Sequence, residues 1–341
     1  MSGPILVFGA RGQAGRELTA LAAARKISVV GLSRAEASIS DNYAVRSAID
    51  MHRPAVVVNV AGYSAVDRAE RDVEAATAAN VTGPSILAAA CADAGIPIVH
   101  LSSAYVFDGN KKVPYVEGDR VNPLGVHGRT KAEGEAKVRE ATKRHIIMRT
   151  SWLYGAYGRN FLRTTLRLAA ERDELKMVAD QVGCPTATVD LAEAILIVVR
   201  KLAEKPNTSG IFHFAGTGST SWHGFAEEIV RRQAIFTGRT PKVTAISTSE
   251  YPSAAKRPAN CELDCSKFAA AFGYRARPWQ ERVHEVVALL STKARIAEAK
   301  AADAKSAEQK PANDASGDGR QGESKPEDLK PTEPKTSETA S

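Results

Sequence analysis

The stretch Gly9-Ala10-Arg11-Gly12-Gln13-Ala14-Gly15 decides the fold, because it joins a strand pattern at residues 4–8 to a helical pattern at residues 16–24. The first glycine permits a tight turn, the second lets the backbone approach a pyrophosphate, and the third lets the helix pack closely on the strand. A glycine triplet alone also fits a purely structural turn. Its place between strand and helix favours dinucleotide binding, and we expect contacts from Gly9, Gly12, Gln13, Ala14 and Gly15.

Strand and helix patterns alternate through the first half of the chain. Strands are predicted at residues 27–32, 55–60, 97–101 and 146–150, with helices at 42–51 and 75–94 and one that contains Lys131 and ends near Thr142. This alternation predicts an α/β fold, a Rossmann-type doubly wound parallel sheet with helices on both faces.

After Tyr154 the pattern loosens. Helices are predicted at residues 161–172, 189–204, 221–236 and 278–303, with one strand at 211–214. We therefore expect a dinucleotide-binding domain at residues 1–150 and a smaller, mainly substrate-binding domain at 151–303 that contributes elements back to the first. From about Ala304 the chain is rich in Lys, Glu, Asp, Ser, Pro, Ala and Gly, so residues 304–341 are predicted to be a disordered tail.

Composition excludes several classes of function. No apolar run approaches the ~20 residues of a membrane span, and no signal-peptide pattern precedes the first strand, so we expect a cytoplasmic protein without a membrane partner. The net charge of +7 is spread along the chain, without a basic stripe interleaved with aromatics, which argues against nucleic-acid binding. The four cysteines are expected to be unlinked thiols that hold no metal.

Two strand ends predict the cofactor contacts. Ser33 and Arg34 follow the second strand, where NAD-selective sites usually place a carboxylate, and Glu36 comes slightly late. A guanidinium suits a 2′-phosphate, so we expect NADPH and leave NADH open. The small residues Ala61 and Gly62, with Tyr63, end the third strand and fit either close approach of the nicotinamide end or a tight bend.

The predicted reaction centre combines two further segments. Ser103 ends the fourth strand, on the edge of a parallel sheet where ligands bind, and its hydroxyl can bind a substrate carbonyl. His127 and Lys131 stand four positions apart. If the helix reaches back to His127, the two side chains share one face, which brings a proton carrier beside an ammonium.

Several motifs together resemble the dTDP-4-dehydrorhamnose reductases, within the extended short-chain dehydrogenases. They are the glycine turn, NVAGYSAVDRAE at 59–70, residues 102–109, GRTKAEGE at 128–135, RTSWLY at 149–154, residues 160–173, DQVGCPT at 180–186, residues 256–258 and residues 278–279. The resemblance covers residues 4 to 290 approximately, and RTSWLY with DQVGCPT is specific to this family.

The resemblance implies reduction of the 4-keto group of a dTDP-linked 6-deoxy sugar by a nicotinamide hydride, giving dTDP-L-rhamnose. It places Ser103, His127 and Lys131 at the family's catalytic Ser/Thr, Tyr and Lys positions. It also implies substrate contacts from Ala104, where the family usually has Asp, and from Trp152, Asn160 and Arg257. Some members hold magnesium between subunits, but Val189 fills one ligand position, so no metal is expected. A homodimer is left open.

The exchange of Tyr for His127 leaves three hypotheses for the proton. His127 is a substitute acid, or Ser103 or water delivers the proton, or activity is lost. Two other functions are considered for this fold. A nucleotide-binding regulatory subunit would keep the fold without the reaction, and a nucleotide-sugar epimerase or dehydratase is disfavoured by RTSWLY and by the missing Tyr.

Overall fold

The computed structural model describes residues 3–308. The described residues up to Arg295 form one compact unit, and those from Ile296 onward belong to a second unit. Helix α11 (Trp279–Glu308) runs across this boundary, so the last helix continues beyond the predicted end at Asp303. Residues 304–308 of the predicted disordered tail are thus helical, and the rest of that prediction lies outside the described residues.

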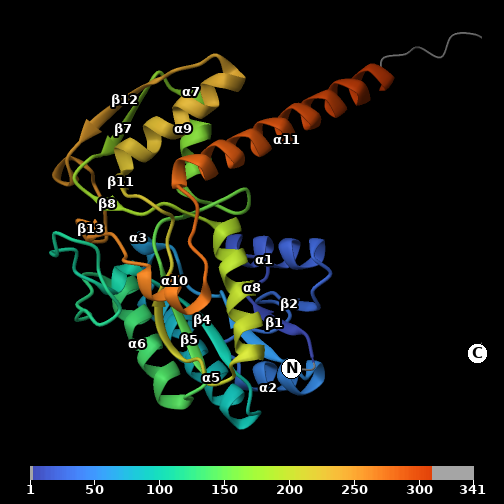
Figure 1. Ribbon diagram of the computed structural model, residues 1–341. Helices are drawn as coiled ribbons and strands as arrows, with labels where there is room; N and C mark the ends of the chain where they lie inside the picture. The colour runs from blue at the N-terminus through green and yellow to red at the C-terminus, as the bar shows by residue number, and fades with distance from the viewer. Residues whose placement is uncertain (1–2, 309–341) are drawn as a thin grey trace, which may run out of the picture. The chain divides into compact units, whose positions relative to one another are not determined.

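A parallel sheet of six strands forms the centre of the fold, with the order β10-β5-β4-β3-β1-β2 (Figure 1). Its strands are β1 (Ile5–Phe8), β2 (Val29–Leu32), β3 (Val56–Asn59), β4 (Ile98–Ser103), β5 (His145–Thr150) and β10 (Gly210–His213). Ile5 lies opposite Val29 of β2 and Val56 of β3, so the strand order changes direction on the two sides of β1. Ligands of open α/β sheets bind beyond the carboxyl ends of the strands at such a point.

Apolar side chains cover both faces of the sheet, which confirms the doubly wound architecture. On one face Val7, Val58 and Met148 pack with residues of α1 (Gln13–Ala24), α8 (Thr188–Glu204) and α10 (Ser266–Phe272). On the other face Leu6 and Val57 pack with α2 (Asn42–His52), α5 (Gly83–Asp93) and α6 (Val126–Ala141). Strands buried on both faces are apolar at nearly every position, as their sequences predicted.

The predicted helix at residues 75–94 is interrupted. It comprises α4 (Val73–Thr77), a π-helical turn (Ala78–Thr82) and α5, and the short helix α3 (Val66–Ala69) precedes it. The whole run Val73–Asp93 is long and apolar enough to span a membrane by length and composition, a test that core helices also pass, and here it packs against α6 and α2. In the π-helical turn Asn80 is fully buried.

The remaining elements form smaller sheets and aromatic clusters. The strands β7 (Glu174–Val178) and β12 (Lys242–Ile246) pair in parallel beside α7 (Phe161–Glu171) and α9 (Trp222–Thr237). Two-residue strands complete this part: β6 (Leu153–Tyr154), β8 (Val182–Gly183), β9 (Thr186–Ala187), β11 (Thr220–Ser221) and β13 (Asn260–Cys261). These small strands were not predicted, because two-residue strands and partly exposed edge strands carry no clear periodicity.

The chain after residue 150 also completes the central sheet. Strand β10 pairs with β5, with Gly210 opposite Ile146, and α8 covers one face of the sheet. The division into domains at 1–150, 151–303 and 304–341 stays a prediction.

Candidate functional site

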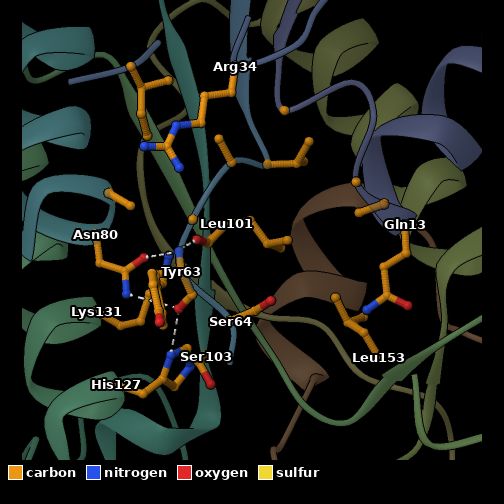
Figure 2. Close-up of a pocket in the computed structure, with 18 of the residues that line it drawn as sticks. Gln13, Arg34, Tyr63, Ser64, Asn80, Leu101, Ser103, His127, Lys131 and Leu153 are labelled. Carbon is orange, nitrogen blue, oxygen red and sulfur yellow. Dashed lines mark hydrogen bonds between the residues drawn. The ribbon is translucent and has the colours of Figure 1, made fainter. Parts of the chain in front are cut away.

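A cavity of about 640 Å³ lies beyond the carboxyl ends of β1, β3 and β4 (Figure 2). Most of the predicted site residues line it: Gly9, Gly12, Gln13, Ala14, Ser33, Arg34, Ala61, Gly62, Tyr63, Ser103, His127, Lys131, Trp152 and Asn160. Gly15, Ala104 and Arg257 do not line it. The cavity therefore joins the glycine turn, the end of β2 and the predicted reaction centre.

The glycine turn leaves open backbone at the start of α1. Gly9 has φ +90°, and a Cβ there would lie 2.6 Å from the Ala61 nitrogen. A Cβ on Gly15 would lie 2.2 Å from the Gly9 carbonyl oxygen, so Gly15 serves the packing of helix on turn. Within α1, all of which is described, the first turn carries no acidic residue and no side chain caps it. Its free N–H groups fit a pyrophosphate.

A carboxylate reaches the end of β2, contrary to our reading of the sequence. Ser33 and Arg34 line the cavity together with Arg11, which we had not predicted as a contact. A turn brings Glu36 back, and its Oε2 accepts a hydrogen bond of 2.7 Å from the Ser33 backbone N–H. Hydrogen bonds from Ser33, and then the charge of Arg11, lower the pKa of Glu36. The guanidinium groups of Arg34 and of Arg11, which lies in the glycine turn, thus line the cavity, and the Glu36 carboxylate lies at Ser33 without lining it.

Helix α6 reaches back to His127, so His127 and Lys131 lie one turn apart and both line the cavity. The Nδ1 atom of His127 lies 3.0 Å from the Tyr63 carbonyl oxygen. Because a carbonyl oxygen only accepts hydrogen bonds, Nδ1 carries the proton of the neutral ring, and Nε2 is then a bare acceptor. Burial, followed by the positive charge of Lys131, lowers the pKa of His127 to about 4, against the opposing effect of the Tyr63 carbonyl. The neutral imidazole therefore dominates at pH 7.

Lys131 is a buried cation that lines the cavity. Its Nζ donates a hydrogen bond of 2.6 Å to the Leu101 carbonyl oxygen. Burial lowers the pKa of Lys131 to about 8, and the charge of Glu135 opposes the shift. Glu135 is itself held by Arg149, with Nη2 of the arginine 2.7 Å from Oε2. A Cβ on Gly62 would lie 3.0 Å from Asn80 Oδ1, so glycine fits the close approach of this amide.

The side chain of Asn80 links Tyr63 to helix α6 through hydrogen bonds, although we had not predicted a role for it. Its Oδ1 accepts from the Tyr63 N–H at 2.8 Å, and its Nδ2 donates to the Tyr63 carbonyl at 3.2 Å and to the Thr130 hydroxyl at 3.1 Å. The Tyr63 carbonyl thus accepts from both Asn80 and His127 (Figure 2). The only signal in the sequence was one amide within an alanine-rich helical pattern.

Ser103 is the last residue of β4 and lines the cavity. Its Oγ accepts a hydrogen bond of 3.1 Å from the Tyr105 N–H, which leaves its own proton available to another acceptor. The Tyr105 ring meets His127 edge-on, with ring centroids 5.9 Å apart. Ala104, by contrast, is fully buried in an apolar cluster with Val106, and its contact with the substrate stays a prediction.

Two other predicted substrate residues have structural partners. Arg257 forms an ion pair with Asp67, with Nη2 2.6 Å from Oδ2, away from the cavity lining. Asn160 lines the cavity but caps helix α7, where its Oδ1 accepts from the Arg163 N–H at 3.0 Å. Trp152 lines the cavity with a backbone φ of +46°.

Comparison with known proteins gives one consistent result. The family model described as RmlD substrate binding domain matches residues 3–292. The chain is similar to a dTDP-4-dehydrorhamnose reductase of Sinorhizobium fredii, with 41% identity over 86% of this chain and 99% of that protein. It is also similar to one of Aggregatibacter actinomycetemcomitans, with 40% identity over 83% and 98%.

Two solved structures agree with these matches. A dTDP-4-dehydrorhamnose reductase of Clostridium acetobutylicum superposes with a TM-score of 0.78 at 40% identity, over 84% of this chain and 99% of the other. One of Bacillus anthracis, in complex with NADP, gives a TM-score of 0.78 at 30% identity over 84% and 99%.

Proposed function

The chain belongs to the dTDP-4-dehydrorhamnose reductase family, and from that premise we propose that it reduces the 4-keto group of dTDP-4-dehydro-6-deoxy-L-mannose to dTDP-L-rhamnose. The observation that carries the proposal is the single cavity shared by the glycine turn, Ser103 and Lys131. It provides a nucleotide-binding turn and two polar groups for a carbonyl at one place. A cytoplasmic location and a homodimer remain predictions.

NADPH is the proposed cofactor, with NADH accepted as well. When bound, it supplies the hydride that adds to the keto carbon. The open start of α1 would hold the pyrophosphate, and Arg34 with Arg11 would hold the 2′-phosphate. Glu36, at the same strand end, suits the ribose hydroxyls of NADH. The relative in complex with NADP supports binding of a nicotinamide cofactor.

We propose that His127 delivers the proton in its imidazolium form. Hydride addition leaves negative charge on the former carbonyl oxygen, which then takes a proton. In imidazolium Nδ1–H still donates to the Tyr63 carbonyl, so Nε2–H is the proton available to the substrate. Ser103 would hold the carbonyl oxygen, and Lys131 would hold the cofactor ribose.

The depressed pKa of His127 lowers the reaction rate at neutral pH, because little of the protein carries imidazolium there. With a pKa of about 4, roughly one molecule in a thousand carries imidazolium at pH 7. The growing charge on the substrate oxygen favours imidazolium during the reaction, because it opposes the repulsion from Lys131.

The test is the conversion of the dTDP-4-keto-6-deoxy sugar by the full chain with NADPH, followed by absorbance of the cofactor and identification of the product. We expect one dTDP-L-rhamnose per NADPH consumed. Lys131→Met and Ser103→Ala should lower kcat by roughly 10²–10⁴ if they act in the reaction, whereas Lys137→Met, on the exposed part of α6, should not. Absence of product in the wild type at every pH would overturn the proposal.

The regulatory-subunit alternative predicts a different result. Such a protein would bind NADPH and dTDP-sugar without turnover. The curated relatives reported above are reductases, which favours the enzyme over this alternative.

A further inference from the structure

Among the described non-glycine residues that line the cavity, Trp152 alone has a positive φ. Three non-glycine residues in the described part of the chain have positive φ: Lys26, Arg53 and Trp152. Lys26 and Arg53 follow the ends of helices, where the left-handed conformation is common. Trp152 lies between β5 and β6, at φ +46°, and a bulky residue adopts this conformation only where its surroundings impose it.

Two neighbours fix the Trp152 indole. The ring of Trp222 stacks on it with centroids 3.5 Å apart and planes inclined by 12°. A Cβ on Gly183 would lie 2.6 Å from the Trp152 ring, so only glycine leaves room there. The Trp152 carbonyl also accepts from the Thr186 N–H at 3.1 Å. The indole is thus held by close contacts with the Gly183 backbone and with a second indole.

Trp222 is anchored independently of the cavity. It is the first residue of α9, whose N-cap Ser221 accepts from the Gly224 N–H at 3.0 Å. Its Nε1 donates to Gln181 Oε1 at 3.2 Å, and Gln181 Nε2 donates to the Thr248 hydroxyl at 3.0 Å. Trp222 does not line the cavity, so it reaches a ligand only through Trp152.

We propose that Trp222 is a positioning residue that holds Trp152 in the cavity wall for the dTDP-sugar. The inference rests on the proposed function and deepens it. Because Trp152 lines the cavity, its fixed indole can contact a sugar or base without the entropic cost of ordering a free side chain. Removing the stack frees Trp152 to leave its strained conformation, which weakens binding of the dTDP-sugar and leaves the cofactor contacts of the glycine turn and of the end of β2 unchanged.

The experiment compares Trp222→Leu, Trp222→Phe and the wild type in the full chain. Calorimetry measures the Kd of dTDP-L-rhamnose and of NADPH, and kinetics measure KM and kcat. Trp222→Leu should raise the Kd and KM for the dTDP-sugar by roughly three- to tenfold, with kcat and the NADPH Kd unchanged. Trp222→Phe retains a ring against Trp152 and should restore most of the affinity.

The matched control is Phe236→Leu, an aromatic near the other end of the same helix α9, which should leave both Kd values unchanged. Equal dTDP-sugar Kd in wild type and Trp222→Leu would overturn the inference. So would parallel losses of NADPH and dTDP-sugar binding, which indicate a merely structural role. A wild type that binds the dTDP-sugar but does not turn it over contradicts only the proposed function, because the calorimetric comparison needs no turnover.

Discussion

At the scale of single residues, the Tyr63 carbonyl determines which ring nitrogen of His127 can exchange a proton with a ligand. It accepts from Nδ1 and so leaves Nε2 as the nitrogen that exchanges protons with a ligand. The i, i+4 placement of His127 and Lys131 was predictable from the sequence. The protonation of His127 was not, because it depends on burial and on a carbonyl supplied by a residue 64 positions away.

Cofactor preference is the first prediction at this scale. Glu36→Gln removes a negative charge from the strand end that carries Ser33 and Arg34, so it should tighten NADPH relative to NADH by roughly three- to tenfold. Arg34→Ala should weaken NADPH and leave NADH nearly unchanged. The measurement is the Kd of each cofactor by fluorescence titration, with Glu171→Gln as a distant control. An equal effect of Arg34→Ala on both cofactors would show that Arg34 does not contact the 2′-phosphate.

At the scale of elements, the interruption of the α4–α5 run places Asn80 in the site. Helix α6 approaches the π-helical turn closely at Gly134, where a Cβ would lie 2.0 Å from the Asn80 carbonyl oxygen. Asn80 then satisfies both backbone groups of Tyr63. The helical pattern predicted a continuous helix here, because a single π-helical turn differs from an α-helix by its i→i+5 hydrogen bonds, which the residue pattern does not record.

Asn80→Ala is the prediction for this element. It leaves the Tyr63 N–H without its partner in a part-buried place, so the free energy of unfolding should fall by about 1 kcal/mol. The Tyr63 carbonyl loses one of two donors, so His127 should also lose its fixed orientation and kcat should fall. Urea unfolding and steady-state kinetics measure the two effects. Thr130→Val, which removes only one neighbouring hydroxyl, is the milder control; unchanged stability in Asn80→Ala would contradict the role assigned to Asn80.

The elements also show how far sequence reasoning reached. The strands and helices of the parallel sheet were predicted because buried strands and amphipathic helices repeat with a clear period. Glu36 was set aside because its distance along the chain from β2 concealed a turn that returns it to Ser33. The resemblance predicts Ala104 at the substrate, and the apolar cluster that buries this residue left no signal in the sequence. Long-range contacts of this kind leave no periodic signal.

At the scale of the whole molecule, buried neutral histidines make the fold sensitive to acid. Burial, and then the charge of Arg149, lowers the pKa of His213 to about 3, and burial with the charge of Lys131 lowers the pKa of His127 to about 4. Burial also holds the pKa of His100 well below its ordinary value. Each of these side chains binds a proton more strongly in the unfolded chain, with a pKa near ~6.5.

The difference between the folded and unfolded pKa values fixes the direction in which stability changes with pH. The stability contributed by these histidines is fully present above pH ~6.5 and falls as the pH drops toward the folded-state pKa values. Between pH ~7 and ~5 we expect a loss of roughly 1–2 kcal/mol per histidine in the free energy of unfolding. Urea midpoints at the two pH values measure it, and His127→Phe should show a smaller loss than the wild type. A midpoint that does not change with pH would contradict burial of these rings in neutral form.

The central claim is that this chain reduces a dTDP-4-keto sugar with a proton from His127. The pH dependence of kcat in the wild type, at saturating NADPH and keto sugar, tests it most directly. Imidazolium with a pKa of about 4 predicts that kcat falls about tenfold for each pH unit between ~5 and ~7, and that His127→Phe removes both the rate and its pH dependence. No turnover in the wild type at any pH, with turnover in His127→Tyr, would contradict the claim and mark a chain that keeps the reductase fold without the reaction.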